Sequence, residues 1–582
     1  MRFVWSTAVS QPAQTERLAL DAGISTLLAR CLLNRGISNS AQAKAYLEPL
    51  LANLSDPFEM EGMRAAVLRL FKARENGERL VIFGDYDVDG VTSTTLLTEV
   101  VAHLGWNVDA YLPHRLDEGY GLTGDAVENC LRKLSPNLLL AVDCGSTSND
   151  VIHGLQESAI DVIVLDHHQP SCPPPAAHAI INPHLRREPG PALGLTGRAG
   201  DLKELCSVGL SFKLAHAIIK HARTLNLPEA TSFDLRPLLD LVALGTIADM
   251  VPLCGENRIL VACGMQRLKS TLRPGIVALK QIAQCSAAVT THEVGFQLAP
   301  RLNATGRLET AEQSLRLLRS ADLPSALPLA RALDQCNRDR QSVERELLEE
   351  SLATVQGRFN PAEDFVIVEG HPRWHIGVVG IIASRILQQF YRPTIILGGD
   401  GAVLRGSGRS VDGFDLGAAL KACGDLLVRH GGHAMAAGVT IDPSNLEAFR
   451  VKLNGLARAA LHSAALKPTL RLDGEVRLAE MSLAAVREFS RMNPMGQGNP
   501  TAQFWTRSVA LARPARRMGA EQQHAKLWLS DGQVTCEAVW WKAPAQIPDG
   551  RFDVAFAPEV NEFGGRVQVQ LKILDWRPTD AV

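Results

Sequence analysis

Three aspartates occupy alternating positions in the segment GDYDVDGVTS, residues 84–93, directly after a short apolar run. In a half-buried site Asp85, Asp87 and Asp89 would repel one another, and a divalent cation makes such crowding tolerable. The alternative is a solvated acidic turn, which is the usual meaning of an Asp-Gly pair. An EF-hand loop starting at Asp85 is excluded, because its twelfth position is Leu96 rather than Glu. The pattern favours metal binding.

Two later segments also place polar side chains directly after an apolar run. Asp143 follows LLLAV, and Asp166, His167 and His168 follow DVIVL. Taken alone, the second segment could equally be a helix cap followed by two surface histidines. Carboxylate and imidazole together suit Mn²⁺ or Mg²⁺.

The elements that must position these residues are short runs rich in Val, Ile and Leu, at 80–84, 138–142 and 161–165. Segments with helical or turn patterns separate them, which is typical of buried parallel strands in an α/β domain. The carboxyl ends of such strands meet at one edge of the sheet, where ligands bind. The acids and histidines are therefore expected to converge.

Asp249 is a fourth candidate, because a carboxylate inside the apolar segment LVALGTIADMVPL is costly unless it is paired or metal-bound. Asp240 nearby is interpreted as a structural acid at a helix start. Two divalent ions about 3.5–4 Å apart, bridged by one carboxylate, would activate a water for in-line displacement at phosphorus. The residue types fit that reaction and leave the substrate open.

The 582-residue chain is long enough for roughly three to five domains. A helical lead-in is expected at 1–77, a surface loop at 185–201 and one long connecting helix at 326–357. A second α/β region is expected at 364–460, and alternating apolar and polar residues at 467–578 predict a small β-barrel or sandwich.

The composition, with 46% hydrophobic residues, 21% charged residues and a net charge of −2, excludes a basic packaging protein but leaves room for a basic groove. Eleven scattered cysteines without a CxxC motif argue against a disulfide framework and a structural zinc. Because the N-terminus lacks a signal-type apolar core and every apolar run is short, we expect a cytoplasmic protein that does not interact with membranes.

The order of GDYDVDG, VDCGST, LDHHQP and GTIADMVPL resembles the DHH phosphoesterase superfamily. Further segments are similar to the RecJ family of 5′-to-3′ exonucleases specific for single-stranded DNA, namely APRLNATGR, WHIGVVGIIASRI, GSGRSV, GGHAMAAG and NPMGQGNPTAQFW. The resemblance runs from about Leu80 to the C-terminal region.

The resemblance implies an α/β fold of two lobes, a DHH parallel-sheet domain and a DHH-associated domain, joined by a long helix and followed by an OB-fold barrel. The implied limits are the lead-in 1–77, catalytic domain 78–310, connecting helices 311–358, substrate-binding domain 359–462 and nucleic-acid-binding barrel 466–580.

The resemblance also implies roles for the polar residues, with two Mn²⁺ or Mg²⁺ ions as cofactors. The implied metal ligands are Asp87, Asp89, Asp143, His167 and Asp249, with Asp143 bridging the ions and His167 and Asp249 completing the second. His168 would contact the scissile phosphate or orient the nucleophile, and Asp85 would lie nearby. Phe83 departs from the wider superfamily, where a histidine ligand is common, so the first ion is expected to lack one protein ligand.

Six residues are implied to bind substrate: Arg301, Asn303, Arg307, Arg409, Ser410 and His433. A guanidinium fork suits phosphate, although an arginine can equally form a surface salt bridge. GSGRS is expected to offer backbone N–H groups, and GGHAMAAG to place His433 on a turn before a small-residue helix. Trp374 is expected in the core. Most of the five C-terminal tryptophans are also expected there, the alternative being base stacking.

The predicted function is therefore metal-dependent 5′-to-3′ hydrolysis of single-stranded DNA in recombination and repair. Two lobes around the site would admit one strand and exclude a duplex. The alternatives are a phosphodiesterase for short RNA or cyclic dinucleotides and a non-catalytic single-strand-binding protein. Single-stranded DNA is the expected partner, with a helicase and a single-strand-binding protein as further family-level expectations.

Overall fold

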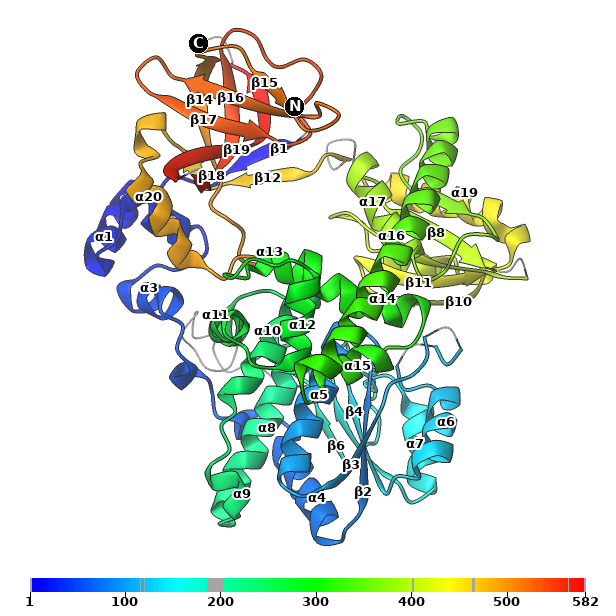
Figure 1. The fold of residues 1–582 in the computed structure, drawn as a ribbon. Coiled ribbons are helices and arrows are strands. Elements are labelled where there is room, and N and C mark those ends of the chain that lie inside the picture. The colour runs from blue at the N-terminus through cyan, green and yellow to red at the C-terminus, as the bar shows by residue number, and fades with distance from the viewer. Residues whose placement is uncertain are drawn as a thin grey trace. The chain divides into compact units, whose positions relative to one another are not determined.

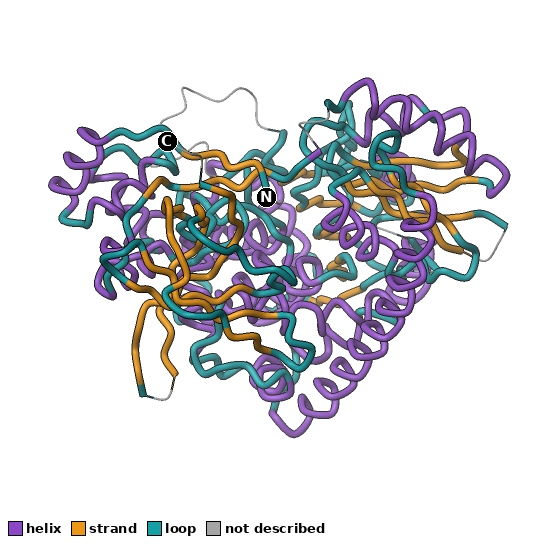
Figure 2. The backbone as a smooth tube through the Cα atoms, turned by 90° about the horizontal axis from the view of Figure 1, so that it is seen from above, coloured by secondary structure: helices purple, strands orange, loops and turns teal. Residues whose placement is uncertain are grey.

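The computed structural model describes residues 3–115, 117–119, 121–185, 202–399, 402–462, 466–563 and 565–579. The chain forms two compact units. The smaller comprises Met1–Ser6 and Gln335–Leu470, and the larger comprises Thr7–Asp334 and Arg471–Val582. Both units combine helices and strands (Figures 1 and 2). The loop expected at 185–201 lies, apart from Leu185, outside the described residues.

A parallel sheet organises the first part of the larger unit, and the three predicted strands are confirmed. Its strand order is β3 (Asn107–Tyr111), β2 (Arg79–Gly84), β4 (Leu138–Val142), β5 (Asp161–Leu165) and β6 (Ala179–Ile181). All four pairings are parallel. We call residues 79–334 the parallel-sheet domain.

Helices cover both faces of this sheet, which explains why its strands are apolar throughout. Leu80 and Ile82 pack with α4 (Met63–Glu75), α5 (Val88–His103) and α8 (Ser207–Thr224). Val81 and Phe83 belong to the core on the other face. That face is covered by α6 (Gly124–Leu134) and α7 (Asn149–Glu157) (Figure 1). Successive residues of a strand face opposite sides, so a strand buried on both needs a continuous apolar run.

The parallel-sheet domain continues in helices beyond α8. They are α9 (Pro228–Thr231), η3 (Arg236–Leu238), α10 (Leu239–Ala248), α11 (Gly255–Lys269), α12 (Pro274–Ile282), α13 (Thr291–Glu293), η4 (Val294–Leu298), α14 (Ala299–Leu308) and α15 (Glu312–Leu318). The predicted long helix is confirmed as α16 (Leu323–Arg358), and the boundary between the two units falls within it.

The smaller unit is the second α/β region that the sequence predicts. Its sheet has the order β10 (Leu427–Gly432), β11 (Ala436–Ile441), β9 (Leu404–Arg409), β8 (Thr394–Gly399) and β7 (Ile367–Gly370). The helices of this region are α17 (Val379–Phe390), α18 (Leu416–Ala422), η5 (Gly424–Leu426), η6 (Pro443–Asn445) and α19 (Leu446–Ala460). Trp374 is buried here, as expected.

Two glycine-rich segments of the smaller unit differ from the sequence prediction. GSGRS is not an open anion-binding loop: its first four residues end strand β9, which pairs with β8 and β11, so backbone N–H groups are used in the sheet. Glycine fits at 408 because a Cβ there would lie 2.6 Å from the Leu416 side chain. Residues 436–438 start strand β11 rather than a helix, and His433 is exposed in the turn before it.

The C-terminal part of the larger unit is a closed barrel, which confirms the expected OB-fold. Its strands are β13 (Gly474–Glu475), β14 (Phe504–Leu511), β15 (Arg516–Met518), β16 (His524–Ser530), β17 (Thr535–Trp540), β18 (Phe552–Phe563) and β19 (Arg566–Pro578). Pairing between β14 and β16 closes the ring, and β17 pairs with β19 in parallel. Three short helices precede β14: η8 (Leu478–Glu480), α20 (Leu483–Glu488) and η9 (Phe489–Met492). We call residues 474–578 the barrel.

The expected lead-in divides between two hydrophobic cores. Helix α4 packs in the core of the parallel-sheet domain, whereas α1 (Pro12–Ala22), α2 (Thr26–Leu33) and α3 (Ser40–Leu47) share the core of the barrel. The remaining elements are β1 (Val4–Thr7), η1 (Leu51–Asn53), η2 (Pro57–Glu59) and β12 (Thr469–Leu472).

All eleven cysteines are free, in agreement with the absence of a disulfide framework. Within the described residues, none of the helices combines the length and the apolarity that crossing a membrane requires.

A buried ion pair offers a test of how the segment before α4 is held. The ammonium of Lys213 is fully buried, 2.7 Å from Glu256, and also donates to Ser55. Replacing Lys213 by Met leaves the carboxylate without its cation, so we expect a loss of about 3–5 kcal/mol in free energy of unfolding, measured with urea. The matched Lys220→Met change breaks an exposed pair with Asp56 and should cost less than about 1 kcal/mol. Equal costs would contradict this assignment.

Candidate metal centre

The carboxyl ends of β2, β4 and β5 bring the predicted acids and histidines together. Three groups of side chains have ligand atoms within 4.8 Å of one another. The groups are Asp85, Asp87 and Asp143; Asp89, His167 and Asp249; and Asp143, His167 and His168. Residues 85–89, 143, 167–168 and 249 thus converge from four separate segments, as the sequence predicts.

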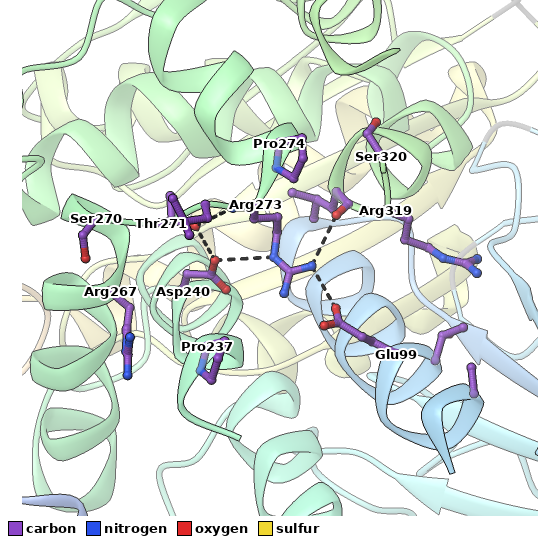
Figure 3. A pocket seen from close by; sticks show the side chains of 14 residues that line it. Glu99, Pro237, Asp240, Arg267, Ser270, Thr271, Arg273, Pro274, Arg319 and Ser320 are labelled. Atoms are coloured by element: carbon purple, nitrogen blue, oxygen red, sulfur yellow. Dashed lines mark hydrogen bonds and ion pairs between the residues drawn. The ribbon is translucent and has the colours of Figure 1, made fainter. Parts of the chain in front are cut away.

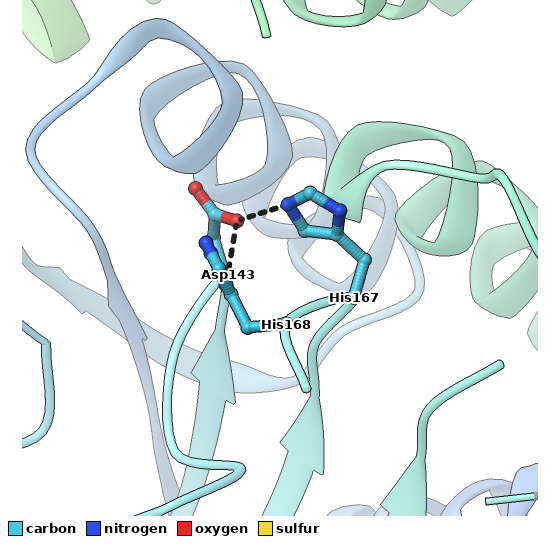
Figure 4. A group of neighbouring side chains, drawn as sticks. All are labelled: Asp143, His167 and His168. Atoms are coloured by element: carbon cyan, nitrogen blue, oxygen red, sulfur yellow. Dashed lines mark ion pairs between the residues drawn. The ribbon is translucent and has the colours of Figure 1, made fainter. Parts of the chain in front are cut away.

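Asp143 lies at the centre of this arrangement and belongs to two of the groups. Its Oδ1 atom is 3.5 Å from Nε2 of His167 and 4.0 Å from Nδ1 of His168 (Figure 4). Its φ is +64°, a left-handed conformation that aspartate tolerates better than most residues. This turn at the end of β4 directs the carboxylate between the two sets of ligands, the place a bridging ligand needs.

The N-terminus of α8 fixes two of the acids through hydrogen bonds. Both oxygens of Asp89 accept backbone N–H bonds, from Ser207 at 2.7 Å and Val208 at 2.8 Å. The Ser207 hydroxyl donates to Oδ1 of Asp143 at 2.8 Å. The positive end of a helix dipole favours negative charge at this position. No sequence motif marks Ser207, and only the structure reveals its contribution.

The two histidines have opposite electrostatic environments. Burial and the neighbouring His168 charge lower the pKa of His167 to about 4, which leaves its imidazole neutral and able to ligate a metal. Burial opposes the charged form of His168 as well, but its 2.8 Å contact with Asp166 raises its pKa to about 9. A protonated His168 suits contact with a phosphate oxygen rather than metal ligation. Asp166, to which the sequence assigns no role, stabilises this proton through its hydrogen bond with His168.

The acids carry more negative charge than their surroundings compensate. Burial, followed by repulsion from neighbouring carboxylates, raises the pKa of Asp85, Asp89 and Asp143. The same causes raise the pKa of Asp249 to about 7. Their mutual repulsion is relieved if the site binds cations.

Unsatisfied buried atoms indicate that this site is built for an ion. Both oxygens of Asp85, Nε2 of His167 and Oδ2 of Asp249 are buried, and none has a hydrogen-bond partner among the described residues. Buried polar atoms without partners are costly, so several pointing into one place require an explanation. Oxygen and imidazole ligands fit Mn²⁺ or Mg²⁺.

Phe83 and Asp85 alter the expected ligand count. Phe83 lies on the face of the sheet that α6 and α7 cover, and its ring stacks on Tyr111 with ring centroids 5.3 Å apart. Asp85, expected only near the site, belongs to the first ligand group. The first ion is expected to lack a protein ligand, because Phe83 stands where the wider superfamily has a histidine. The Asp85 carboxylate could supply that missing ligand.

Helix α14 carries three of the predicted substrate-binding residues and contacts the acidic segment. Oδ1 of Asn303 accepts the backbone N–H of Val88 at 3.1 Å, beside the acidic segment. Arg301 pairs with Asp334 at 2.9 Å, which is the salt-bridge alternative, and Arg307 lies near Tyr86.

In the smaller unit, Ser410 is buried and donates to the carbonyl of Phe414. Arg409 there donates to the carbonyl of Gly408. The substrate roles of all six predicted residues stay predictions.

Asp240 is a structural acid, as the sequence indicates. It accepts a 2.7 Å hydrogen bond from Thr271 and pairs with Arg273, which also pairs with Glu99 (Figure 3). These residues line a cavity of about 610 Å³ that includes none of the metal-ligand candidates.

Comparison with known proteins places this site in a family. The model of the DHH family, N-terminal domain, matches residues 79–246, the DHHA1 domain matches 363–459, and the RecJ OB domain matches 472–575. Single-stranded-DNA-specific exonuclease RecJ of Dickeya dadantii is 34% identical over 96% of this chain and 97% of that protein. Its Escherichia coli counterpart is 33% identical over 96% and 97%. The chain belongs to the RecJ family.

The solved structures agree with this RecJ assignment. RecJ of Thermus thermophilus in complex with Mn²⁺ matches all of this chain and 80% of that chain, with a TM-score of 0.84 and 30% identity. The same protein in complex with Mg²⁺ matches with a TM-score of 0.77 and 28% identity, over all of this chain and 79% of that one. The expected combination of DHH domain, DHH-associated domain and OB-fold is therefore confirmed.

The raised pKa of Asp249 predicts how the metal-free RecJ-family protein responds to pH. Unfolded aspartate titrates near pH 4, so between about pH 4 and 7 the folded state holds the extra proton and stability falls as pH rises. Urea unfolding in EDTA should give a lower free energy of unfolding at pH 7 than at pH 5. Added Mn²⁺ should stabilise more at the higher pH.

The variant Asp249→Asn isolates this effect, because the low pKa of His167 acts in the opposite direction. We expect the variant to lose less stability between pH 5 and 7 than the unmodified protein. An identical pH dependence in both would contradict the assignment.

Proposed function

We propose that this RecJ-family chain is a metal-dependent exonuclease that hydrolyses single-stranded DNA from the 5′ end with two Mn²⁺ or Mg²⁺ ions. The observation that carries the proposal is the convergence of buried acids and a neutral imidazole, with several unpartnered atoms, at one edge of the sheet. The metal ligands would be Asp87, Asp89, Asp143, His167 and Asp249, together with Asp85.

The chain's own residues suggest how the reaction is arranged. The ions, when bound, supply Lewis acidity and lower the pKa of a bound water. Asp143 would hold both halves of the centre at a fixed separation, because Ser207 restrains its carboxylate. His168, kept protonated by Asp166, would donate to an oxygen of the scissile phosphate or to the leaving group. The fixed positions favour in-line displacement.

The surface of the barrel favours a single strand over a mononucleotide as the substrate. Trp541 is 54% exposed and lies edge-on to His524, with ring centroids 4.7 Å apart. The Arg513 guanidinium lies 3.5 Å from the Trp528 ring. Aromatic and cationic surfaces of this kind stack bases without reading sequence. By contrast, Trp505 and Trp540 are buried, as expected for barrel core.

The remaining expectations rest on the family resemblance. A role in recombination and repair, a helicase and a single-strand-binding protein as partners, a cytoplasmic location and the expected domain limits stay predictions. The RecJ relatives are described as specific for single-stranded DNA, and the smaller alternatives within the superfamily account neither for the barrel nor for the α1–α3 helices packed into its core.

The Asp143→Ala variant tests the proposed activity. Removing the carboxylate that two ligand groups share should lower hydrolysis of labelled single-stranded DNA with Mn²⁺ by more than about a hundredfold. Asp109→Ala is the matched control, because it removes an acid of the same sheet that pairs with Arg79 at the surface. The control should keep full activity. Cleavage confined to dinucleotides, or binding of the strand without turnover, would contradict the proposal.

The 5′ polarity has a separate test. A strand blocked at its 5′ end by a bulky adduct should resist degradation, whereas a 3′ block should leave the early release of nucleotides unchanged. Products are followed with a label at either end. Strand binding should also weaken steeply with salt, because phosphate contacts release counterions. Equal degradation of both blocked strands would show that the end is not selected.

A further inference from the structure

Arg258 in α11 is a buried cation whose hydrogen bonds join the parallel-sheet domain to residues 491–494 of the barrel, at the end of η9 and directly after it. It is 3% exposed, although arginine is seldom buried. Its three nitrogens donate to five backbone carbonyls: Tyr46 (2.9 Å), Arg491 (3.5 Å), Met492 (2.8 Å), Asn493 (2.9 Å) and Pro494 (3.3 Å). A guanidinium has five N–H groups, so this environment matches its full capacity.

Two further side chains close the cage around this guanidinium. The ring of Tyr46 lies 3.7 Å from the Arg258 guanidinium carbon, a cation–π contact in a desolvated place. The Tyr46 hydroxyl donates to Asn499 at 2.6 Å, and the Asn499 amide donates to the carbonyls of Met492 and Pro494. Carbonyl dipoles and a ring face therefore stabilise the cation, and no ion pair with an acid is found for it among the described residues.

The residues that follow, 496–498, are attached a second time, to the segment directly after α10. Leu253 N–H donates to the carbonyl of Gln497 at 2.8 Å. A Cβ on Gly496 would lie 2.8 Å from the Leu253 side chain, and one on Gly498, which has φ +67°, would lie 2.7 Å from Pro252. The glycines of NPMGQGNP are thus explained by close packing. Leu253 follows the candidate ligand Asp249 by four residues.

The clamped segment, residues 491–499, lies next to residues of the barrel core. Phe489 and Met492, at the ends of η9, are buried in the same core as Phe504 of the barrel. Contacts between domains are commonly small and polar, so relative motion is the ordinary expectation. Here Arg258 binds the carbonyls of the last two residues of η9 and of the two residues after them. These hydrogen bonds oppose such motion.

We propose that Arg258 is a positioning residue for long strands: it fixes the barrel against the parallel-sheet domain so that one strand engages both at once. The inference rests on the proposed function. A strand held at the barrel enters the catalytic centre as an intramolecular event, and the gain depends on the geometry being fixed. A short strand that occupies the catalytic centre alone gains nothing from the clamp.

Arg258→Met tests this inference, because it keeps a flexible, unbranched apolar stem and removes all five N–H donors. One oligonucleotide of about 30 nucleotides covers both domains, and one of about 6 fits the catalytic centre alone. With Mn²⁺, we expect the KM of the long strand to rise about tenfold or more. The KM of the short strand and kcat for both should stay unchanged.

Arg392→Met is the matched control. Arg392 is also buried and donates to four backbone carbonyls, of Pro361, Asp364, Phe390 and Tyr391, with the Phe359 ring 5.6 Å away. That cage lies wholly within the smaller unit. Its loss should lower the thermal unfolding temperature without changing the ratio of long-strand to short-strand KM.

Asn499→Ala provides a second, milder variant in case Arg258→Met does not fold. It removes the amide that holds two of the clamped carbonyls and should raise the same KM ratio by a smaller factor. A wild-type ratio in the folded variants overturns the inference and leaves the proposed function standing. Absence of single-strand hydrolysis by the wild-type protein overturns the proposed function itself.

Discussion

Repulsion between buried carboxylates is the constraint on which the rest of this structure depends. Asp85, Asp89 and Asp143 are each at most 2% exposed, close to one another and to Asp249. Like charges at these distances in a poorly hydrated site would drive the segments apart or force protonation. The backbone donors of α8 and the short strands of the sheet hold the carboxylates in place. The folded protein therefore keeps a repulsion between carboxylates that a bound cation would relieve.

The parallel sheet makes this arrangement possible because the ends of its strands bring residues that are distant in the sequence to one edge. The strand ends supply Asp85, Asp143 and His167, and the C-terminus of α10 supplies Asp249. The two histidines differ in pKa because their environments differ. Two adjacent residues of one type acquire opposite protonation states because Asp166 bonds to only one of them.

Much of this could be predicted from the sequence, for physical reasons that particular residues illustrate. A strand buried on both faces must be apolar throughout, so LLLAV and DVIVL indicate their own position and that of the acid that follows. GSGRS misled because glycine suggests loops, whereas here it lets a strand approach Leu416. Ser207 gave no signal, since any residue can offer a backbone N–H and a single serine hydroxyl forms no motif. The role of Asp166 depends on the orientation of His168. Arg258 likewise acts through carbonyls, which have no sequence signature.

The shared core of helices α1–α3 and the barrel has a consequence for biosynthesis. The Ser25 backbone N–H bonds to Glu488, a partner 463 residues later in the chain. At about 5–20 residues per second, that partner leaves the ribosome roughly 20 to 90 seconds later. During this interval Leu28 and Leu32, which are fully buried in the finished protein, have no barrel to pack against. During this interval the nascent chain exposes the apolar faces of α1–α3, and chaperones bind exposed apolar surface of this kind.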